Sequence, residues 1–338
     1  MKIGDRIKYI DFFKAIAMIL VIMGHVNFAN QGVKAWIYSF HMPAFFFATG
    51  LVLIFTNTPG GGNLMTVVSK YFKRLMLPFL LWGLVFSKFS IPHLILICYG
   101  SYRSISKAGS LTSLWFLPVM YVAVLLLFMI SRIRGKKIET WLMFSLCIIA
   151  FIVGVSMPLL GIGYPFSLNV ALVALFFMTL GNIIRPYIDQ IYDSLKAGKK
   201  RGVSVCLLLT LVFAGGSLTY MMNTQEIAYI HMGLERFGNP ILFAITSMCG
   251  ILMLLFFCIM LEFLNSKITK GLLFIGQNTL CIFAVQKPII SCFRKLFLIY
   301  PMDDNLVLFF TTVGTLTVSC GLCIIINKYV PAFVGRSV

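Results

Sequence analysis

The first apolar stretch of the chain carries titratable side chains at spacings that suit chemistry. Asp11 and Lys14 lie at its start, and His25 lies near its end. An imidazole takes up and releases a proton near neutral pH, while a Lys–Asp pair supplies fixed charge. Ionisable side chains are costly within a bilayer, so such residues in an apolar segment are candidates for a functional site.

Helical spacing places these residues on one face. Lys14 and His25 are separated by about three turns, or roughly 16 Å, of α-helix. At about 100° per residue, the two side chains point nearly the same way. Asp11, one turn before Lys14, is placed to pair with it. We therefore predict a helix with a charged pair at one end and an imidazole at the other.

A second histidine lies early in the next apolar run. His41 occurs in the sequence Phe40-His41-Met42-Pro43. A short connection makes the two helices antiparallel neighbours, which puts His25 and His41 at similar depth and facing one cavity. Pro43 lacks a backbone N–H, so it also frees a carbonyl in this region.

Each of these residues also has a purely structural interpretation. A histidine in a membrane helix can be a hydrogen-bonded packing residue, and Lys14 can extend its amine to lipid headgroups. Trp115, in a later run, can be an interfacial anchor. Two histidines at matched depth above a Lys–Asp pair favour a functional cavity over packing.

A basic segment precedes the third apolar run and contains Lys70, Lys73 and Arg74. Such a cluster can face anionic lipid and set the topology. It can equally bind phosphate groups on the cytoplasmic side of the membrane. The sequence alone leaves both interpretations open.

The composition indicates that the elements positioning these residues are membrane helices. Hydrophobic residues make up 60% of the 338 residues and charged residues 11%, whereas a soluble domain carries roughly a quarter charged residues. Runs of about 20 apolar residues span a bilayer core of roughly 30 Å. We predict such runs at 10–29, 36–55, 75–98, 112–131, 140–157, 167–184, 203–222, 239–263, 271–291 and 305–326.

The predicted fold class is all-α, a polytopic membrane protein of about ten transmembrane helices. One integral membrane domain is expected over residues 1–338, with no soluble domain. Ser90 and Pro92 interrupt the third run, which is predicted to be broken or re-entrant. Turns rich in Gly, Pro or Lys separate other runs, as at 58–62 and 134–137. We expect a retained first helix, because no signal-peptide cleavage site follows it.

The basic residues set the expected orientation. Lys and Arg number 28, against 10 Asp and Glu. With the N-terminus in the cytoplasm, about two thirds of these cations fall on the cytoplasmic side, as the positive-inside rule expects. Both termini are then cytoplasmic, and the outer cations, Lys287 among them, are loop charges that need no nucleic-acid partner. The cysteines lie in apolar runs without metal-ligand spacing, so no metal site is expected.

With these residues in view, the chain resembles the acyltransferase-3 family of integral membrane O-acyltransferases. The resemblance is strongest in the first part of the chain and weaker in three later segments. The matching segments are Tyr9-Ile10-Asp11 with Lys14 and His25, Phe40-His41-Met42-Pro43 through Gly50, the basic segment with Pro78, Leu114-Trp115-Phe116-Leu117, and Gly276-Gln277-Asn278-Thr279-Leu280.

Two positions depart from the family pattern. Lys14 stands where family members very often carry Arg, and lysine keeps the charge but loses the bidentate fork. Gln286 stands where members often carry a late histidine, and it can form hydrogen bonds but cannot titrate. A role for a late histidine is therefore not expected, and a distinct subfamily or acceptor stays open.

The resemblance implies an O-acyltransferase that moves an acyl group, expected to be acetyl, from cytoplasmic acetyl-CoA to a hydroxyl of a sugar or glycan. Direct transfer and an acyl-histidine relay are both open. The implied roles are His25 as general base, Lys14 with Asp11 for orienting the donor, Lys70, Lys73 and Arg74 for the CoA phosphates, and His41 and Trp115 on the acceptor side.

The implied partners are acyl-CoA, a carbohydrate or lipid-linked glycan and membrane lipids, with no nucleic acid and no metal. The implied location is a cell membrane, expected to be a bacterial plasma membrane. The alternative is a proton-coupled transporter or flippase for a sugar or lipid-linked metabolite, which also uses intramembrane Lys, Asp and His. Such carriers usually show repeated halves with paired broken helices, and we find no internal repeat.

Overall fold

The chain is helical throughout the part that the structure describes. The computed structural model describes residues 7–26, 30–53, 63–107, 110–132, 139–160, 163–223, 230–264 and 269–336. Within these ranges the chain forms fourteen α-helices and several short helical turns, with no β-strand, which confirms the all-α prediction. The predicted turns at 58–62 and 134–137 lie outside the described residues.

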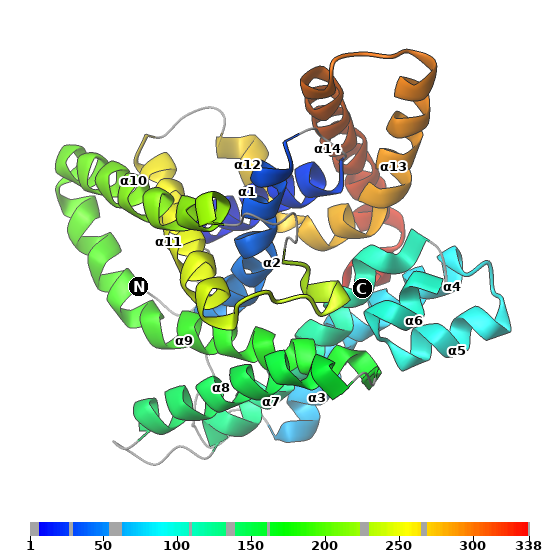
Figure 1. Ribbon diagram of the computed structural model, residues 1–338, viewed down its shortest axis with the longest axis horizontal. Coiled ribbons are helices and arrows are strands. Elements are labelled where there is room, and N and C mark those ends of the chain that lie inside the picture. The colour runs from blue at the N-terminus through cyan, green and yellow to red at the C-terminus, as the bar shows by residue number, and fades with distance from the viewer. Residues whose placement is uncertain are drawn as a thin grey trace.

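The helices follow the predicted apolar runs, and Figure 1 shows their arrangement in space. Their bounds are α1 Lys8–His25, α2 Gln31–Val52, α3 Leu64–Tyr71, α4 Leu77–Phe86, α5 Ile91–Tyr99, α6 Tyr102–Lys107, α7 Phe116–Arg132, α8 Glu139–Ser156, α9 Leu168–Ala197, α10 Lys199–Asn223, α11 Pro240–Leu264, α12 Thr269–Gln277, α13 Thr279–Ile299 and α14 Asp304–Tyr329. Each predicted run overlaps at least one helix, although α9 continues well beyond its run.

Six helices in the described part are long and apolar enough to cross a membrane: α2, α7, α9, α10, α11 and α14. They confirm a membrane protein. α1 and α13 are not among the six because they carry too much charge, namely Lys8, Asp11 and Lys14 in α1 and Lys287, Arg294 and Lys295 in α13. The total of about ten spanning helices and the cytoplasmic position of both termini stay predictions.

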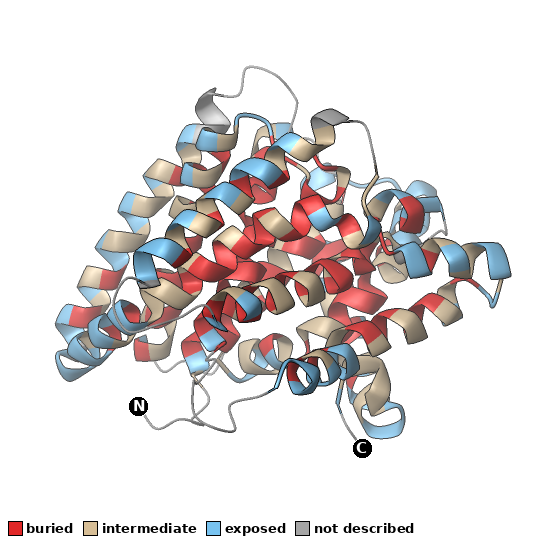
Figure 2. Ribbon diagram, turned by 90° about the horizontal axis from the view of Figure 1, so that it is seen from below, coloured by how far each residue is buried: buried red, intermediate tan, exposed pale blue. Residues whose placement is uncertain are grey.

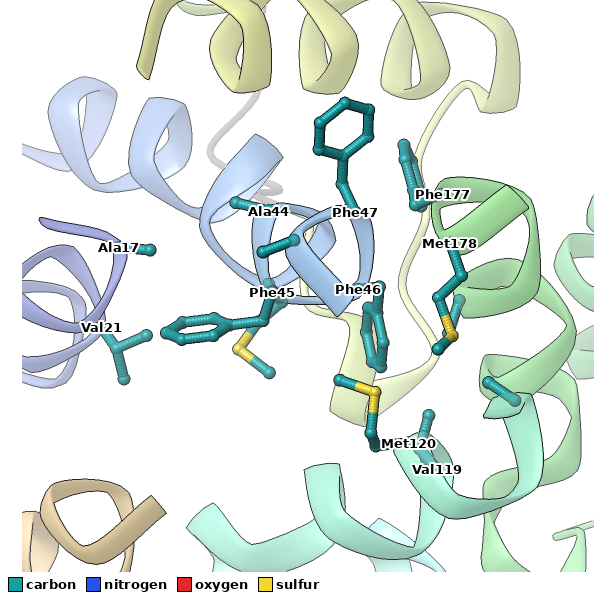
Figure 3. Packing of buried hydrophobic residues seen from close by; sticks show 14 of the residues in the cluster. Ala17, Val21, Ala44, Phe45, Phe46, Phe47, Val119, Met120, Phe177 and Met178 are labelled. Carbon is teal, nitrogen blue, oxygen red and sulfur yellow. The ribbon is translucent and has the colours of Figure 1, made fainter. Parts of the chain in front are cut away.

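The centre of the bundle is built around α2. This helix packs against α1, α9, α10 and α11. In Figure 3, Phe45 of α2 points toward Val21 of α1, and Phe46 points toward Met120 of α7. Buried residues concentrate along this centre and exposed residues lie at the periphery (Figure 2). The packing holds α1 and α2 side by side, as their short connection predicts.

Pro43 leaves a backbone carbonyl of α2 without its helical partner, as predicted. A proline here removes the N–H that would bond the Ser39 carbonyl, one turn earlier in the helix. Ser247 of α11 replaces that partner, because its Oγ donates to the Ser39 carbonyl oxygen at 2.5 Å. The substitute hydrogen bond ties α2 to α11 close to His41.

Two predicted runs are divided into separate helices. The third run divides into α4 and α5, because Lys88 and Phe89 adopt φ angles of 50° and 60°; the predicted interruption is confirmed. The ninth run, predicted as one helix over 271–291, divides into α12 and α13 at Asn278. The Asn278 side chain donates to the Phe274 carbonyl at 2.7 Å, which stabilises the end of α12.

Candidate active site

The start of α1 holds the predicted pair of Asp11 and Lys14. Lys14 Nζ lies 3.5 Å from Asp11 Oδ1, and the Asp11 side chain is only 3% exposed. Helix α12 lies directly against this turn, since a Cβ added to Gly276 would lie 2.0 Å from the Asp11 carbonyl oxygen. A residue with a side chain could not approach so closely, so glycine sets the contact between α1 and α12.

Residues near the C-terminus connect this end of α1 to the basic segment. Arg336 donates from Nη2 to Asn278 Oδ1 at 3.2 Å, and Asn278 directly follows α12. The neighbouring Gly335 packs against the backbone carbonyl of Arg74. A short series of contacts therefore leads from Asp11, through the α12–α13 break and the C-terminal residues, to Arg74.

The basic segment itself, Lys70, Lys73 and Arg74, is exposed. Lys73 and Arg74 lie in a π-helical turn, Phe72–Met76 (η1). Turns of this kind are rare and frequently occur at functional sites. The turn packs against α7. Through the contact of Gly335 with the Arg74 carbonyl, the basic segment is connected to the Asp11–Lys14 end of α1.

The opposite end of α1 gathers a second group of titratable side chains. His25, the last residue of α1, is half-buried. It interacts electrostatically with Lys287, His41, His231 and Lys34, of which Lys287 acts most strongly. The structure thus places His25 within electrostatic range of His41, and it adds residues from distant segments. We call His25, His41, His231 and Lys287 the histidine cluster.

His41 is held in one tautomer. Its Nδ1 lies 2.8 Å from the Ile37 carbonyl oxygen. A carbonyl only accepts, so Nδ1 carries the hydrogen and Nε2 of the neutral ring keeps a lone pair. Tyr38 packs edge-on against the His41 ring at a centroid distance of 4.9 Å, and its hydroxyl donates to the Gly24 carbonyl at 3.1 Å. Tyr38 thereby connects His41 to the residue preceding His25.

A cap segment, residues 230–237, reaches the cluster from the connection between α10 and α11. His231 and Arg236 pair through two backbone hydrogen bonds of 2.8 and 3.1 Å. Between them, Glu235 adopts a φ angle of 61°. The buried Glu235 carboxylate accepts from Arg103 Nη2 at 3.1 Å. Since Arg103 belongs to α6, this ion pair anchors the cap segment to that helix.

His231 is the residue of the cap segment that enters the cluster. Its ring centroid lies 5.5 Å from that of Tyr38 and 5.4 Å from that of Tyr102. Burial lowers the pKa of His231 to about 4, so the ring is neutral at neutral pH. Nδ1 accepts from the Leu234 N–H at 3.1 Å, which leaves the hydrogen on Nε2. His41 and His231 are therefore fixed in opposite tautomers.

Trp115 borders the cluster from a 3-10 turn, Ser110–Trp115 (η2), directly before α7. Its side chain is only 5% exposed. Its ring lies 6.3 Å from Tyr102, which itself contacts His231. Burial among these rings does not fit an exposed interfacial anchor, so Trp115 is placed with the cluster.

Lys287 lies inside a helix that belongs to the predicted run 271–291. The charge count includes it only as an outer cation, and in the structure it lies within α13 and is only partly exposed. Its Nζ donates to Thr112 Oγ1 of η2. The preceding residue, Gln286, is fully buried. The residue that follows Gln286 is therefore a lysine that acts on His25.

Comparison with known proteins gives one decisive match. A family model described as an acyltransferase domain matches residues 7–324, nearly the whole chain. The chain belongs to the acyltransferase-3 family. Membership supports an acyltransferase, and the six apolar helices place it in a membrane. No curated protein and no solved structure matches the chain.

Membership of the acyltransferase-3 family does not favour the transporter or flippase alternative.

Two residues near His25 in this acyltransferase were not predicted from the sequence, namely Lys287 and His231. Lys287 interrupts an apolar run beside Gln286, and His231 is one of only four histidines in the chain. The interrupted run and the scarcity of histidine are both visible in the sequence, but no sequence pattern relates either residue to His25.

Proposed function

We propose that this acyltransferase moves an acyl group, acetyl in our proposal, from acyl-CoA to a hydroxyl group of a sugar or glycan. The donor would approach the Asp11–Lys14 end of α1 from the cytoplasm of a bacterial cell, and the acceptor would approach the His25 end. One observation carries the proposal: the His25 imidazole lies in a cluster of titratable side chains, about three helical turns from the Asp11–Lys14 pair.

His25 is the general base of the proposed reaction. Ester formation requires a group that removes the hydroxyl proton as the oxygen attacks the thioester carbonyl, and a neutral imidazole does this near pH 7. The C–O bond forms, the C–S bond breaks, and the CoA thiolate leaves with the proton that His25 took up. Transfer through an acyl-histidine intermediate would use the same imidazole.

The donor side of the proposal uses the charges at the start of α1 and the basic segment. Lys14, oriented by Asp11, would position the donor. The basic segment would bind the CoA phosphates through charge-assisted hydrogen bonds. Its exposure and the contacts that lead from Arg74 to Asn278 support this role. The extended pantetheine arm would then carry the acyl group along α1 toward His25.

The acceptor side of the proposal uses His41 and Trp115. Because Nδ1 of His41 is bound to the Ile37 carbonyl, its Nε2 can accept a hydrogen bond from a sugar hydroxyl. Trp115 lies beside Tyr102, and aromatic rings provide apolar surface against which a sugar ring can pack. These groups would orient one acceptor hydroxyl toward His25.

The basic segment gives a testable prediction for the donor. The double variant Lys73→Ala, Arg74→Ala should raise the Kd for acyl-CoA at least about tenfold, since a hydrogen bond to a charged group contributes roughly 1.5–3 kcal/mol. Isothermal titration calorimetry with acetyl-CoA measures the change. Lys200→Ala, Arg201→Ala is the matched control, because these residues are an exposed Lys–Arg pair on α10. Equal Kd values in wild type and the first variant would leave the segment as a lipid-facing topology signal.

The proposed function is tested by incubating the purified protein with labelled acetyl-CoA and a panel of glucose, rhamnose and N-acetylglucosamine. We expect label to appear on a sugar as an ester, with equimolar release of CoA that depends on the sugar. Movement of a sugar across a proteoliposome membrane without CoA release would instead support a transporter. Absence of both activities would count against the proposed donor or acceptor class.

A further inference from the structure

Lys287 is a cation in the histidine cluster. General-base catalysis by His25 assigns no role to this lysine. It belongs to α13, which packs against α1, and of the charged groups that act on His25 it acts most strongly. A lysine that served topology alone would extend its amine toward the lipid headgroups. Lys287 instead donates to Thr112 Oγ1, whereas Lys295, on the same helix, is exposed. The hydrogen bond to η2 therefore directs this ammonium group inward.

The contact between α13 and η2 is polar on both sides. Helix α13 packs against η2, and Lys287 joins Thr112 across the contact. The next residue of η2, Ser113, and the preceding residue of α13, Gln286, are both buried. Ser113 Oγ and Gln286 Oε1 lack hydrogen-bond partners among the described residues. Buried polar groups normally form hydrogen bonds. These two oxygen atoms could therefore form hydrogen bonds with a polar group of a substrate beside the Lys287 ammonium.

We propose that Lys287 stabilises the negative charge that develops on the acyl carbonyl oxygen during transfer, and that Thr112 holds its ammonium group in position. The inference rests on the proposed acyl transfer. As the acceptor oxygen bonds to the carbonyl carbon, the carbonyl π electrons move to oxygen and the hydroxyl proton moves to His25. The resulting oxyanion faces the Lys287 ammonium.

Collapse of this tetrahedral intermediate completes the transfer. The electron pair on the oxyanion re-forms the carbonyl, the C–S bond breaks, and the CoA thiolate takes the proton from the His25 imidazolium. A fixed cation contributes most while the charge on oxygen is greatest, so it lowers the barrier more than it strengthens substrate binding. Lys287 is thus a catalytic residue in this scheme, and Thr112 is a positioning residue.

The test compares Lys287→Met with wild type in nanodiscs, using acetyl-CoA, the sugar panel above and CoA release as the readout. Removal of one such donor should lower kcat by about 100-fold to 1,000-fold, with KM values for donor and acceptor within about threefold of wild type. Lys295→Met is the matched control and should keep wild-type kcat. Lys287→Arg, which retains the charge, should recover part of the loss.

Thr112 provides a second, independent variant. Thr112→Val keeps the side-chain shape but removes the oxygen that Lys287 bonds, so kcat should fall with KM unchanged, while Thr112→Ser should restore it. If Lys287→Met does not fold, Lys287→Arg and the Thr112 pair decide the question. Wild-type kcat in Lys287→Met or in Thr112→Val would overturn the assignment and leave the acyltransferase proposal intact. A wild-type protein that releases no CoA with any sugar would overturn both.

Discussion

Replacing His25 with glutamine is expected to lower kcat for acyl transfer by about 100-fold to 10,000-fold, the range that positioned general bases contribute. Glutamine resembles histidine in size and forms hydrogen bonds, but it cannot take up a proton. His25→Ala should show a similar loss, because it also lacks a base. The measurement is acceptor-dependent CoA release, together with the thermal unfolding midpoint of each variant.

The chain offers a matched control for this substitution. His93, in α5, is also partly exposed and belongs to a helix outside the histidine cluster. His93→Gln should therefore retain kcat within about twofold of wild type. If His25→Gln or His25→Ala retains near-normal kcat with unchanged unfolding, the base must be another residue, and His41 with its available Nε2 would be the next candidate.

Features that depend on one helix or on one short connection could be predicted from the sequence. The helical period predicts the Asp11–Lys14 pair, which is present at 3.5 Å. The short connection predicts that α1 and α2 are neighbours, as they are. The missing N–H of Pro43 predicts a freed carbonyl, and Ser39 supplies it. In each case the geometry of a few consecutive residues is sufficient.

The rest of the candidate site comes from long-range packing, which local rules do not determine. Lys287 acts on His25 from α13, which packs against both α1 and η2. His231 acts on His25 from the cap segment, which the Arg103–Glu235 ion pair anchors to α6. No period or motif links these segments to α1. The positive-inside rule counts Lys287 only as an outer cation, and that count does not indicate which side chains the lysine contacts.

Gly276 illustrates a motif whose physical reason became clear only in the structure. In the sequence it belongs to one of the weaker family matches, without an assigned role. In the structure it allows α12 to touch the Asp11 carbonyl, and the following Asn278 accepts from Arg336. The motif therefore shapes the donor end of α1 by close helix packing, not by contributing a titratable side chain.

Replacing Gly50 with alanine is expected to destabilise the fold more than other single-methyl additions. Gly50 of α2 and Gly181 of α9 lie where the two helices are in closest contact: an added Cβ would lie 1.9 Å from the Met178 carbonyl oxygen at Gly50 and 2.3 Å from the Phe47 carbonyl oxygen at Gly181. Because backbone atoms cannot move aside as a side chain can, the helices must separate. Overpacking of this kind costs about 3 kcal/mol, the upper end of the usual range.

Separation would also break the hydrogen bonds that α9 makes to the end of α2. Asn182 Nδ2 donates to the Leu53 carbonyl, and Arg185 Nη1 donates to the Leu51 carbonyl, each at 2.6 Å. We expect Gly50→Ala to lower the thermal unfolding midpoint by about 4 °C. A thiol-reactive fluorophore can follow unfolding, because cysteines such as Cys147 and Cys258 are buried in the folded protein.

Gly215→Ala is the control, since Gly215 lies in α10 with no atom within 4 Å of an added Cβ. Alanine is favoured over glycine within a helix by about 0.5–1 kcal/mol, so this variant should unfold at the same temperature as wild type or slightly higher. Equal midpoints for Gly50→Ala and Gly215→Ala would mean that α2 and α9 are not held at this distance. The position of His41 on α2 would then have to be fixed by other contacts, chiefly those of Ser247 with Ser39 and of Tyr38 with Gly24.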